Sequence, residues 1–299
     1  MSPFPEAWKS KFVTNWPSYA GAIGKLDLSV DGVHLWVCEL NDIKDWDRIA
    51  AEQNLLSKAE RQRLARFKDT TAWQLGLLSQ VMRRHVLAAY LPSYSPAAWR
   101  FATNVHGKPH ITAPAAGTGW QFNLSHTHER IVLGISRQHV LGVDTETPTR
   151  QTDWLGIARR FFHPEEFRYM STLDASQQQH WFFQAWTLKE AYLKACGAGL
   201  AGGLDRLQIR DIALQAIDYT IAGEATPWWL GLIDWQQDRP IAVCCQTQPN
   251  ALRLYRLRPF TDITLCGHSL RCRSTPPDFF QLEQPGRVFD GSQAAPPNC

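Results

Sequence analysis

Residues 120–146 have the sequence WQFNLSHTHERIVLGISRQHVLGVDTE, which carries the strongest strand signal of the chain. It contains three largely apolar segments, 120–126, 130–136 and 140–146, separated by short polar connections. Short segments of this kind, bounded by turn residues, predict three consecutive β-strands.

Upstream, the pattern alternates between strand and helix. A strand is predicted at 33–40, and the side chains of Ser57 and Glu60 have the spacing of a capping box, which predicts a helix running to about residue 67. A second helix is predicted from about 71 to 90, ended before Pro92. Residues 101–111 are typical of two strands joined by a turn at 107–109.

Downstream, the same alternation recurs. Helices are predicted at 153–162, 164–173 and 177–196, and later strands at about 207–212, 228–234 and 241–246. The order of strand, helices and strands therefore occurs twice. It predicts an α+β fold of two pseudo-symmetric halves, each a small, mainly antiparallel sheet with packed helices. The expected division is an irregular lead-in at 1–32, a first half at 33–138, a second half at 139–260, and a flexible, Pro- and Gly-rich tail at 261–299.

Composition narrows the class of protein. The chain has 299 residues with 44% hydrophobic and 20% charged residues, which excludes a disordered chain. A formal charge of +3 is too small to indicate nucleic acid or a membrane as partner. No signal peptide or membrane span is visible, and the seven scattered cysteines indicate neither a disulfide framework nor a structural zinc site. We therefore expect a cytoplasmic protein, and a monomer, because one chain could build a complete cleft.

Two carboxylates stand at the end of the last strand in the opening stretch. Asp144 and Glu146 are two residues apart, so both side chains leave the same face. Adjacent carboxylates repel, and a divalent cation with oxygen ligands relieves that repulsion. The alternative is two exposed acids at the start of a loop.

The helix predicted at 177–196 supplies a third carboxylate. Thr187, Glu190 and Lys194 fall within an arc of roughly 60°, while most of the remaining circumference is apolar. A mostly buried helix with one narrow polar strip indicates a functional strip. The alternative is an ordinary Glu→Lys surface pair four residues apart.

Several other motifs contain side chains that could bind a metal ion or a phosphate. The four histidines at 106, 110, 126 and 128 lack zinc-ligand spacing, and the G-x-G-x-x-G match at 197–202 follows a helix, so it indicates a helix stop and a loop, not a dinucleotide site. Ser125 and His126, at a strand end, could hold a phosphate. Cations cluster at 58–68 either as a solvated face or as a site for a phosphate or an acidic partner.

Five motifs in order and spacing resemble the 4'-phosphopantetheinyl transferases of the large, Sfp-type class. They are Gly107-Lys-Pro109, Asn123-Leu-Ser-His126, Gly142-Val-Asp-Thr-Glu146, Arg160-Phe-Phe162 followed by Glu166, and Trp186-Thr-Leu-Lys-Glu-Ala-Tyr-Leu-Lys194. The resemblance covers roughly residues 33–250. It implies two α+β halves with coenzyme A in the cleft between them. It also implies Mg²⁺-dependent transfer of the phosphopantetheine arm to a serine of an apo acyl or peptidyl carrier protein, with release of adenosine 3',5'-bisphosphate.

The same resemblance implies roles for individual residues. Asp144, Glu146 and Glu190 would hold Mg²⁺, with Mn²⁺ left open, and Lys194 would contact the transferred phosphate. Lys108, Pro109, Ser125 and His126 would meet the coenzyme, Arg61 or Arg63 its 3'-phosphate, and Glu190 or Glu166 would be the general base. Gln74 stands where a basic residue is common in the family, and the register of Arg61 and Arg63 is uncertain by a residue or two.

The chemistry of these residues agrees with phosphoryl transfer, which needs charge neutralisation and positioning more than an enzyme nucleophile. Two other functions remain as alternatives. One is an inactive paralogue that binds coenzyme A or a carrier protein. The other is a metal-dependent phosphohydrolase.

Overall fold

The computed structural model describes residues 26, 28–114, 116, 118–148, 153–197, 199, 203–213, 216–223, 228–235, 238–259 and 262–271, the last range by its backbone alone. In this part of the chain no helix is long and apolar enough to cross a membrane.

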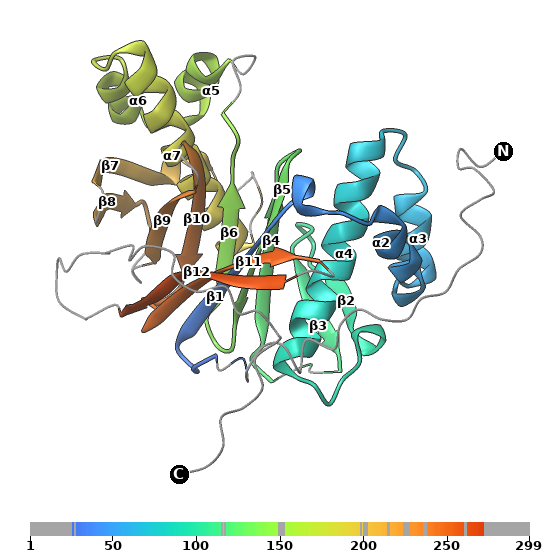
Figure 1. The fold of residues 1–299 in the computed structure, drawn as a ribbon. Coiled ribbons are helices and arrows are strands. Elements are labelled where there is room, and N and C mark those ends of the chain that lie inside the picture. Colours follow the sequence, from blue (N-terminus) through green and yellow to red (C-terminus); the bar gives the residue numbers. More distant parts are fainter. Residues whose placement is uncertain are drawn as a thin grey trace, which may run out of the picture.

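A five-stranded sheet forms the first layer (Figure 1). Its strand order is β12-β11-β1-β5-β4, and all neighbouring pairs are antiparallel except β1 and β11. The bounds are β1 Gly32–Glu39, β4 Gln121–His126, β5 Arg130–Ser136, β11 Ala251–Arg258 and β12 Asp262–Arg271.

Helices cover one face of this sheet. The long helix α4 (Thr70–Tyr90) packs on it, with α2 (Trp46–Ala51) and α3 (Lys58–Leu64) outside, and the hairpin of β2 (Arg100–Thr103) and β3 (Pro109–Ala113) follows. The apolar residues of α4, such as Leu78 and Met82, share one buried cluster with Trp36 of β1 and Leu133 of β5. The Ser57–Glu60 capping box is present, although its helix ends at Leu64, three residues earlier than predicted. Short 3-10 segments also occur at 40–42, 52–55, 96–98 and 204–206.

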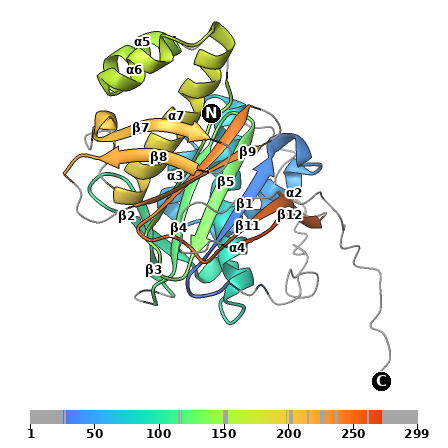
Figure 2. The same cartoon turned by 90° about the vertical axis from the view of Figure 1, so that its left-hand side faces the viewer.

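A three-stranded antiparallel sheet, ordered β6-β10-β9, forms the second layer. Its strands are β6 Leu141–Thr145, β9 Trp229–Trp235 and β10 Arg239–Cys245. Helix α7 (Ala175–Cys196) packs on this sheet, and α5 (Trp154–Phe161), α6 (Pro164–Met170) and the hairpin of β7 (Leu207–Ala213) and β8 (Ala216–Ile221) surround it. Figure 2 shows α5 and α6 beside one end of α7, away from the first sheet.

The two layers repeat one order of elements. Each has a strand, helices, a hairpin and two further strands, and in each sheet the last of these strands lies between the first and the other one: β1-β5-β4 and β6-β10-β9. A separate apolar cluster joins the sheets, with Val33, Leu35 and Val37 of β1 and Val143 of β6 among its members. Alternate residues of β1 therefore face the partner sheet and α4, as the period-two geometry of a strand requires.

The last strands differ from the sequence prediction. No strand was predicted at 251–258: these residues were assigned to the second half, but as β11 they join the sheet of the first, and β12 occupies 262–271, in the predicted flexible tail at 261–299. Strand β11 pairs with β1, far earlier in the chain, which no local pattern reports, and β12 then pairs with β11 as its next neighbour along the chain. Strand β8 was also missed. The predicted lead-in lies mostly, and residues 272–299 wholly, outside the described residues.

Glycine at position 142 sets the distance between β6 and α7. A Cβ atom at Gly142 would lie 2.0 Å from the carbonyl oxygen of Ala191 and 2.3 Å from the amide nitrogen of Ala195. Only glycine permits this contact between a strand backbone and a helix backbone. It places the start of β6 directly against the last turns of α7.

Candidate functional site

Three polar side chains meet where the two sheets adjoin. Asp144 Oδ1 accepts hydrogen bonds from Ser125 Oγ at 2.7 Å and from Lys194 Nζ at 2.6 Å, and Lys194 Nζ lies 2.7 Å from Ser125 Oγ. Ser125 comes from β4, Asp144 from β6 and Lys194 from α7. The Val143 amide donates to Asn123 Oδ1 at 2.8 Å, which fixes β6 beside β4. The structure thus brings together three residues that the sequence predicted for the site.

The other two predicted carboxylates lie around Asp144. Glu146 Oε1 accepts a hydrogen bond from Trp186 Nε1 at 3.1 Å. Burial, followed by the charge of Asp144, raises the pKa of Glu146 to about 7, and the charge of Glu190 adds to this. Burial and Asp144 also raise the pKa of Glu190. These directions indicate carboxylates that lack enough positive charge nearby.

Asp144 itself has an unused atom. Its Oδ2 is buried and has no hydrogen-bond partner among the described residues. A buried acceptor without a partner costs about 1–3 kcal/mol, so a ligand at this position is expected. Together with the raised pKa values, this atom indicates a place for a cation.

The donor set suits a hard divalent cation, since carboxylate oxygens are the ligands that Mg²⁺ and Mn²⁺ prefer. In the described ranges no three His, Cys, Asp or Glu side chains are already arranged to hold a metal ion. Lys194 now provides the positive charge against Asp144, with an ion pair at 2.6 Å. The side chains are thus of the type that binds such a cation. In this structure Asp144 contacts Lys194, and Glu146 contacts Trp186.

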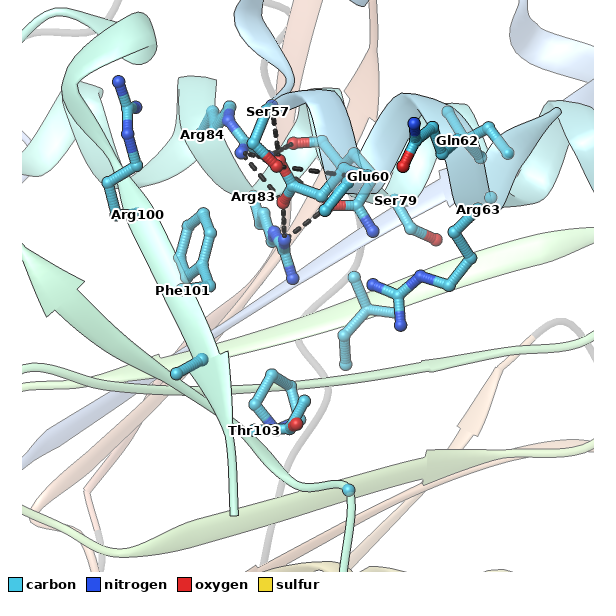
Figure 3. Close-up of a pocket in the computed structure, with 18 of the residues that line it drawn as sticks. Ser57, Glu60, Gln62, Arg63, Ser79, Arg83, Arg84, Arg100, Phe101 and Thr103 are labelled. Carbon is cyan, nitrogen blue, oxygen red and sulfur yellow. Dashed lines mark hydrogen bonds and ion pairs between the residues drawn. The ribbon is translucent and has the colours of Figure 1, made fainter.

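A second polar feature is a pocket of about 770 Å³, and Figure 3 shows Glu60, Arg63, Arg83 and Arg84 among the residues that line it. Its walls come from α3, α4, the β2–β3 hairpin and the end of β4, and its cations are Arg63, Arg66, Arg83, Arg84 and Arg100. His126 also lines the pocket, and the charges of Lys194 and Asp144 both act on its ring, so this part of the pocket lies near the Asp144 cluster. Burial, followed by the Lys194 charge, lowers the pKa of His126. A concave surface with five arginines is suited to an anionic ligand.

One carboxylate is placed among these arginines. Glu60 Oε1 lies 2.8 Å from Arg83 Nη2, and Glu60 Oε2 lies 2.8 Å from Arg84 Nη2. Burial raises the pKa of Glu60, but hydrogen bonds from Arg84 and the Ser57 amide outweigh it and lower the pKa to about 2. For Arg83, burial and then the charge of Arg84 lower the pKa to about 9. The glutamate that caps α3 therefore also holds two arginines of α4.

The structure separates the predicted coenzyme contacts into two groups. Arg63 and Pro109 line the large pocket, whereas Arg61 does not and donates to the carbonyl oxygen of Leu56. Lys108 is not among the lining residues either. Its Nζ donates to the carbonyl oxygens of Leu141 at 3.1 Å and Ala195 at 2.8 Å, and burial lowers its pKa. The Lys108 side chain therefore joins the β2–β3 turn to β6 and α7.

Glu166 is occupied by contacts inside the second layer. It is 1% exposed, its Oε2 accepts from the His163 amide at 2.7 Å, and its Oε1 accepts from the Ile209 amide at 2.7 Å. The ammonium of Lys189 lies 2.8 Å from Oε1. All of these partners belong to α6, its cap, β7 or α7, and the structure does not bring Glu166 into the cluster around Asp144.

Sequence reasoning missed two kinds of residue. Arg83 and Arg84 were treated as part of an ordinary helix, although two adjacent cations in an apolar stretch are a signal for a buried polar contact. Trp186 was named only as part of a motif, yet it is the hydrogen-bond partner of Glu146. Together with Glu146 it also lines a smaller pocket of about 360 Å³, with Thr127, Thr147 and Phe182 among its other walls.

Comparison with known proteins adds an independent observation. A model of the 4'-phosphopantetheinyl transferase superfamily matches residues 140–244. The 4'-phosphopantetheinyl transferase HetI of Nostoc sp. is 32% identical over 205 residues, which cover 69% of this chain and 84% of the relative. The 4'-phosphopantetheinyl transferase Sfp of Bacillus subtilis is 27% identical over 64% of this chain and 82% of its own length. The 4'-phosphopantetheinyl transferase gsp of Aneurinibacillus migulanus is 31% identical over 55% of this chain and 65% of the relative.

Proposed function

Since the chain belongs to the 4'-phosphopantetheinyl transferase family, of the Sfp type, we propose that it works through the cluster around Asp144 and the arginine-lined pocket. It is an enzyme that transfers the phosphopantetheine arm of coenzyme A to a carrier protein. The pocket binds the nucleotide end of coenzyme A, and the pyrophosphate lies at the cluster. The acceptor is a serine of an apo acyl or peptidyl carrier protein, and the leaving product is adenosine 3',5'-bisphosphate.

The arrangement of charge supports this placement. The pocket supplies arginines, the cluster supplies carboxylates, and His126 lies between them. Coenzyme A carries phosphates at two places, so it needs cationic side chains at one and a metal site at the other. Arg63 is the proposed contact for the 3'-phosphate, because it lines the pocket and Arg61 does not. Pro109 also lines this pocket. Lys108 keeps the adjoining turn in place through its hydrogen bonds to Leu141 and Ala195.

Asp144, Glu146 and Glu190 would hold Mg²⁺, and Mn²⁺ has the same donor preference. The unpartnered Oδ2 of Asp144 and the raised pKa of Glu146 support this assignment. Bound there, the cation would offset the pyrophosphate charge and improve the bisphosphate as a leaving group.

The protein side chains carry the remaining steps. Ser125 and His126 orient the phosphates at the end of β4. Lys194, 30% exposed, turns its ammonium from Asp144 toward the transferred phosphoryl group and stabilises its growing charge. Glu190, half-buried and with a raised pKa, accepts the proton of the incoming serine directly or through water. Glu190 takes this role rather than Glu166, whose two oxygens already have partners.

The proposal also covers the architecture, the cellular location and the oligomeric state of the protein. The repeated element order supports two pseudo-symmetric halves, with the division near residue 138, and a cleft between them as the active site. Cys38 and Cys244 are buried thiols outside any disulfide in the described part of the chain, and a reducing cytoplasm is the proposed location. The pocket and the cluster both come from one chain, which supports a monomer.

The meeting of Ser125, Asp144 and Lys194 beside the pocket is the observation that carries the proposal. The test is to incubate the protein with coenzyme A, Mg²⁺ and an apo carrier protein and to weigh the carrier by mass spectrometry. The expected carrier is heavier by one phosphopantetheine arm, and Glu190→Gln should slow this by orders of magnitude. Binding without modification would indicate an inactive paralogue, and cleavage of coenzyme A without transfer would indicate a phosphohydrolase.

A further inference from the structure

The large pocket contains a carboxylate that its proposed ligand does not need. Of the charged residues that line it, only Glu60 is acidic among the residues the structure describes, and it lies against two arginines. We propose that Glu60 determines how strongly the enzyme prefers coenzyme A over 3'-dephospho-coenzyme A. It does so by occupying Arg83 and Arg84, so that Arg63 and Arg66 are left to bind the extra phosphate. This inference rests on the proposed binding of coenzyme A in this pocket.

Glu60 behaves as an internal anion. Its Oε1 accepts from Arg83 Nη2 at 2.8 Å and from Arg84 Nη2 at 2.9 Å, and its Oε2 accepts from Arg84 Nη2 at 2.8 Å and from the Ser57 amide at 2.7 Å. The side chain is 12% exposed. Both oxygens are therefore used on protein groups, in contacts of the same kind as those a phosphate makes with arginine.

The two arginines are held in place from behind as well. Arg84 Nη1 donates to the carbonyl oxygen of Gln80 at 3.1 Å, and Arg83 donates to the Gln80 side chain. The Arg83 guanidinium lies 3.8 Å from the centre of the Phe101 ring. At 7% and 1% exposed, Arg83 and Arg84 have little freedom to turn toward a ligand while Glu60 is present.

The arginine pair still exceeds its partner in charge. Two guanidinium groups face one carboxylate, and the Nε atoms of both arginines are buried without a hydrogen-bond partner in the described chain. Removal of the Glu60 charge would free one more anion-binding position in the pocket wall. The pair is therefore suited to a phosphate, and Glu60 competes for it.

Arg63 and Arg66 differ from this pair. Both lie on or just after α3, both line the pocket, and both are exposed. Glu60 and Arg63 are three residues apart on the helix, so their side chains share a face. A phosphate that binds Arg63 consequently lies near the Glu60 carboxylate, and the repulsion reduces the gain from that phosphate.

The test measures dissociation constants for coenzyme A and 3'-dephospho-coenzyme A by isothermal titration calorimetry, with the full chain and no carrier protein. The ratio of the two constants isolates the 3'-phosphate. Glu60→Gln should raise the preference for coenzyme A about tenfold, as expected for one charge removed at pocket distances in a partly solvated site. Glu52→Gln is the matched control: Glu52 also pairs with a buried base, His85 at 3.3 Å, but does not line the pocket, and its ratio should stay as in the parent.

Glu60→Gln could unfold the protein, so a second variant works in the opposite direction. Gln62 lines the same pocket and is exposed, and Gln62→Glu should lower the preference for coenzyme A about threefold. Ratios that equal the parent ratio in both variants would overturn the inference while leaving the proposed function intact. Failure of the parent to bind either compound would overturn the placement of coenzyme A instead.

Discussion

The polar groups of the two layers have opposite charge balances: arginines predominate in the first layer and carboxylates in the second. In the first, one carboxylate, Glu60, lies among arginines, and its pKa falls to about 2 because hydrogen bonds from Arg84 and Ser57 outweigh burial. In the second, one ammonium, Lys194, lies among carboxylates, and burial and Asp144 raise the pKa of Glu146 to about 7. The same side-chain chemistry thus has opposite shifts in two similar frameworks.

The contrast shows that two layers with the same order of strands and helices can bind different parts of one ligand. The first layer has spare positive charge and the second has spare negative charge. Substitutions that change one pattern at a time should therefore separate catalysis from coenzyme binding.

Asp144→Ala should have the largest effect, because it removes the acceptor shared by Ser125 and Lys194 and a proposed metal ligand. We expect transfer to fall by about a thousandfold or more, with a change in unfolding free energy below about 2 kcal/mol. The measurements are the rate of carrier modification and thermal unfolding. Normal turnover at saturating Mg²⁺ would exclude a metal role for Asp144.

Lys194→Ala should lower turnover about a hundredfold, because it removes positive charge from the transferred phosphate. The Michaelis constant for coenzyme A should change less, since the arginines of the pocket remain. Steady-state kinetics at saturating carrier would test this. If only the Michaelis constant for coenzyme A changed, Lys194 would be a coenzyme-binding residue like the arginines of the pocket, and the proposed role on the transferred phosphate would be wrong.

Arg63→Ala should act mainly on binding. We expect the Michaelis constant for coenzyme A to rise about tenfold, the value for the loss of one charged hydrogen bond. Arg61→Ala is the matched control, because Arg61 lies two residues away but does not line the pocket. Equal effects of the two substitutions would contradict the placement of the 3'-phosphate at Arg63.

The contribution of the Glu60 contacts should be measurable as a loss of unfolding free energy at acid pH. The folded pKa of Glu60 is about 2 against an ordinary value of 4.5, so its stabilisation is complete above about pH 4.5 and is lost as pH falls toward 2. Between pH 4.5 and pH 2 the Glu60→Gln variant should therefore lose about 2–3 kcal/mol less unfolding free energy than the parent protein. Denaturant unfolding between pH 2 and 6 measures it, and parallel curves for parent and variant would contradict the assignment.

The sequence predicted the local elements well, and long-range contacts less well. The strands around residues 120–146 and helices α4 and α7 follow from period and caps, with Ser57 and Glu60 as the clearest case. Strands β11 and β12 were not predicted, because β11 pairs with the distant β1 and β12 is added to the sheet only through β11.

For the site, the motifs predicted Asp144 and Lys194, and the structure shows them in contact. They could not show that Glu166 and Lys108 make buried contacts with protein groups, since a motif fixes residue type and spacing but not partners. The arginine pair of α4 was likewise hidden, because its partner Glu60 lies on another helix.

The hydrogen bonds of Lys108 to Leu141 and Ala195 give the molecule a built-in reporter. An amine-acylating reagent modifies lysines in proportion to their access to water. Two exposed lysines set the reference rate: Lys58, the first residue of α3, and Lys68, between α3 and α4. The protection of Lys108 relative to these two then records how often the turn at 104–108 leaves β6 and α7. Mass-spectrometric footprinting could follow that opening in cell extract, without a substrate or an assay for transfer.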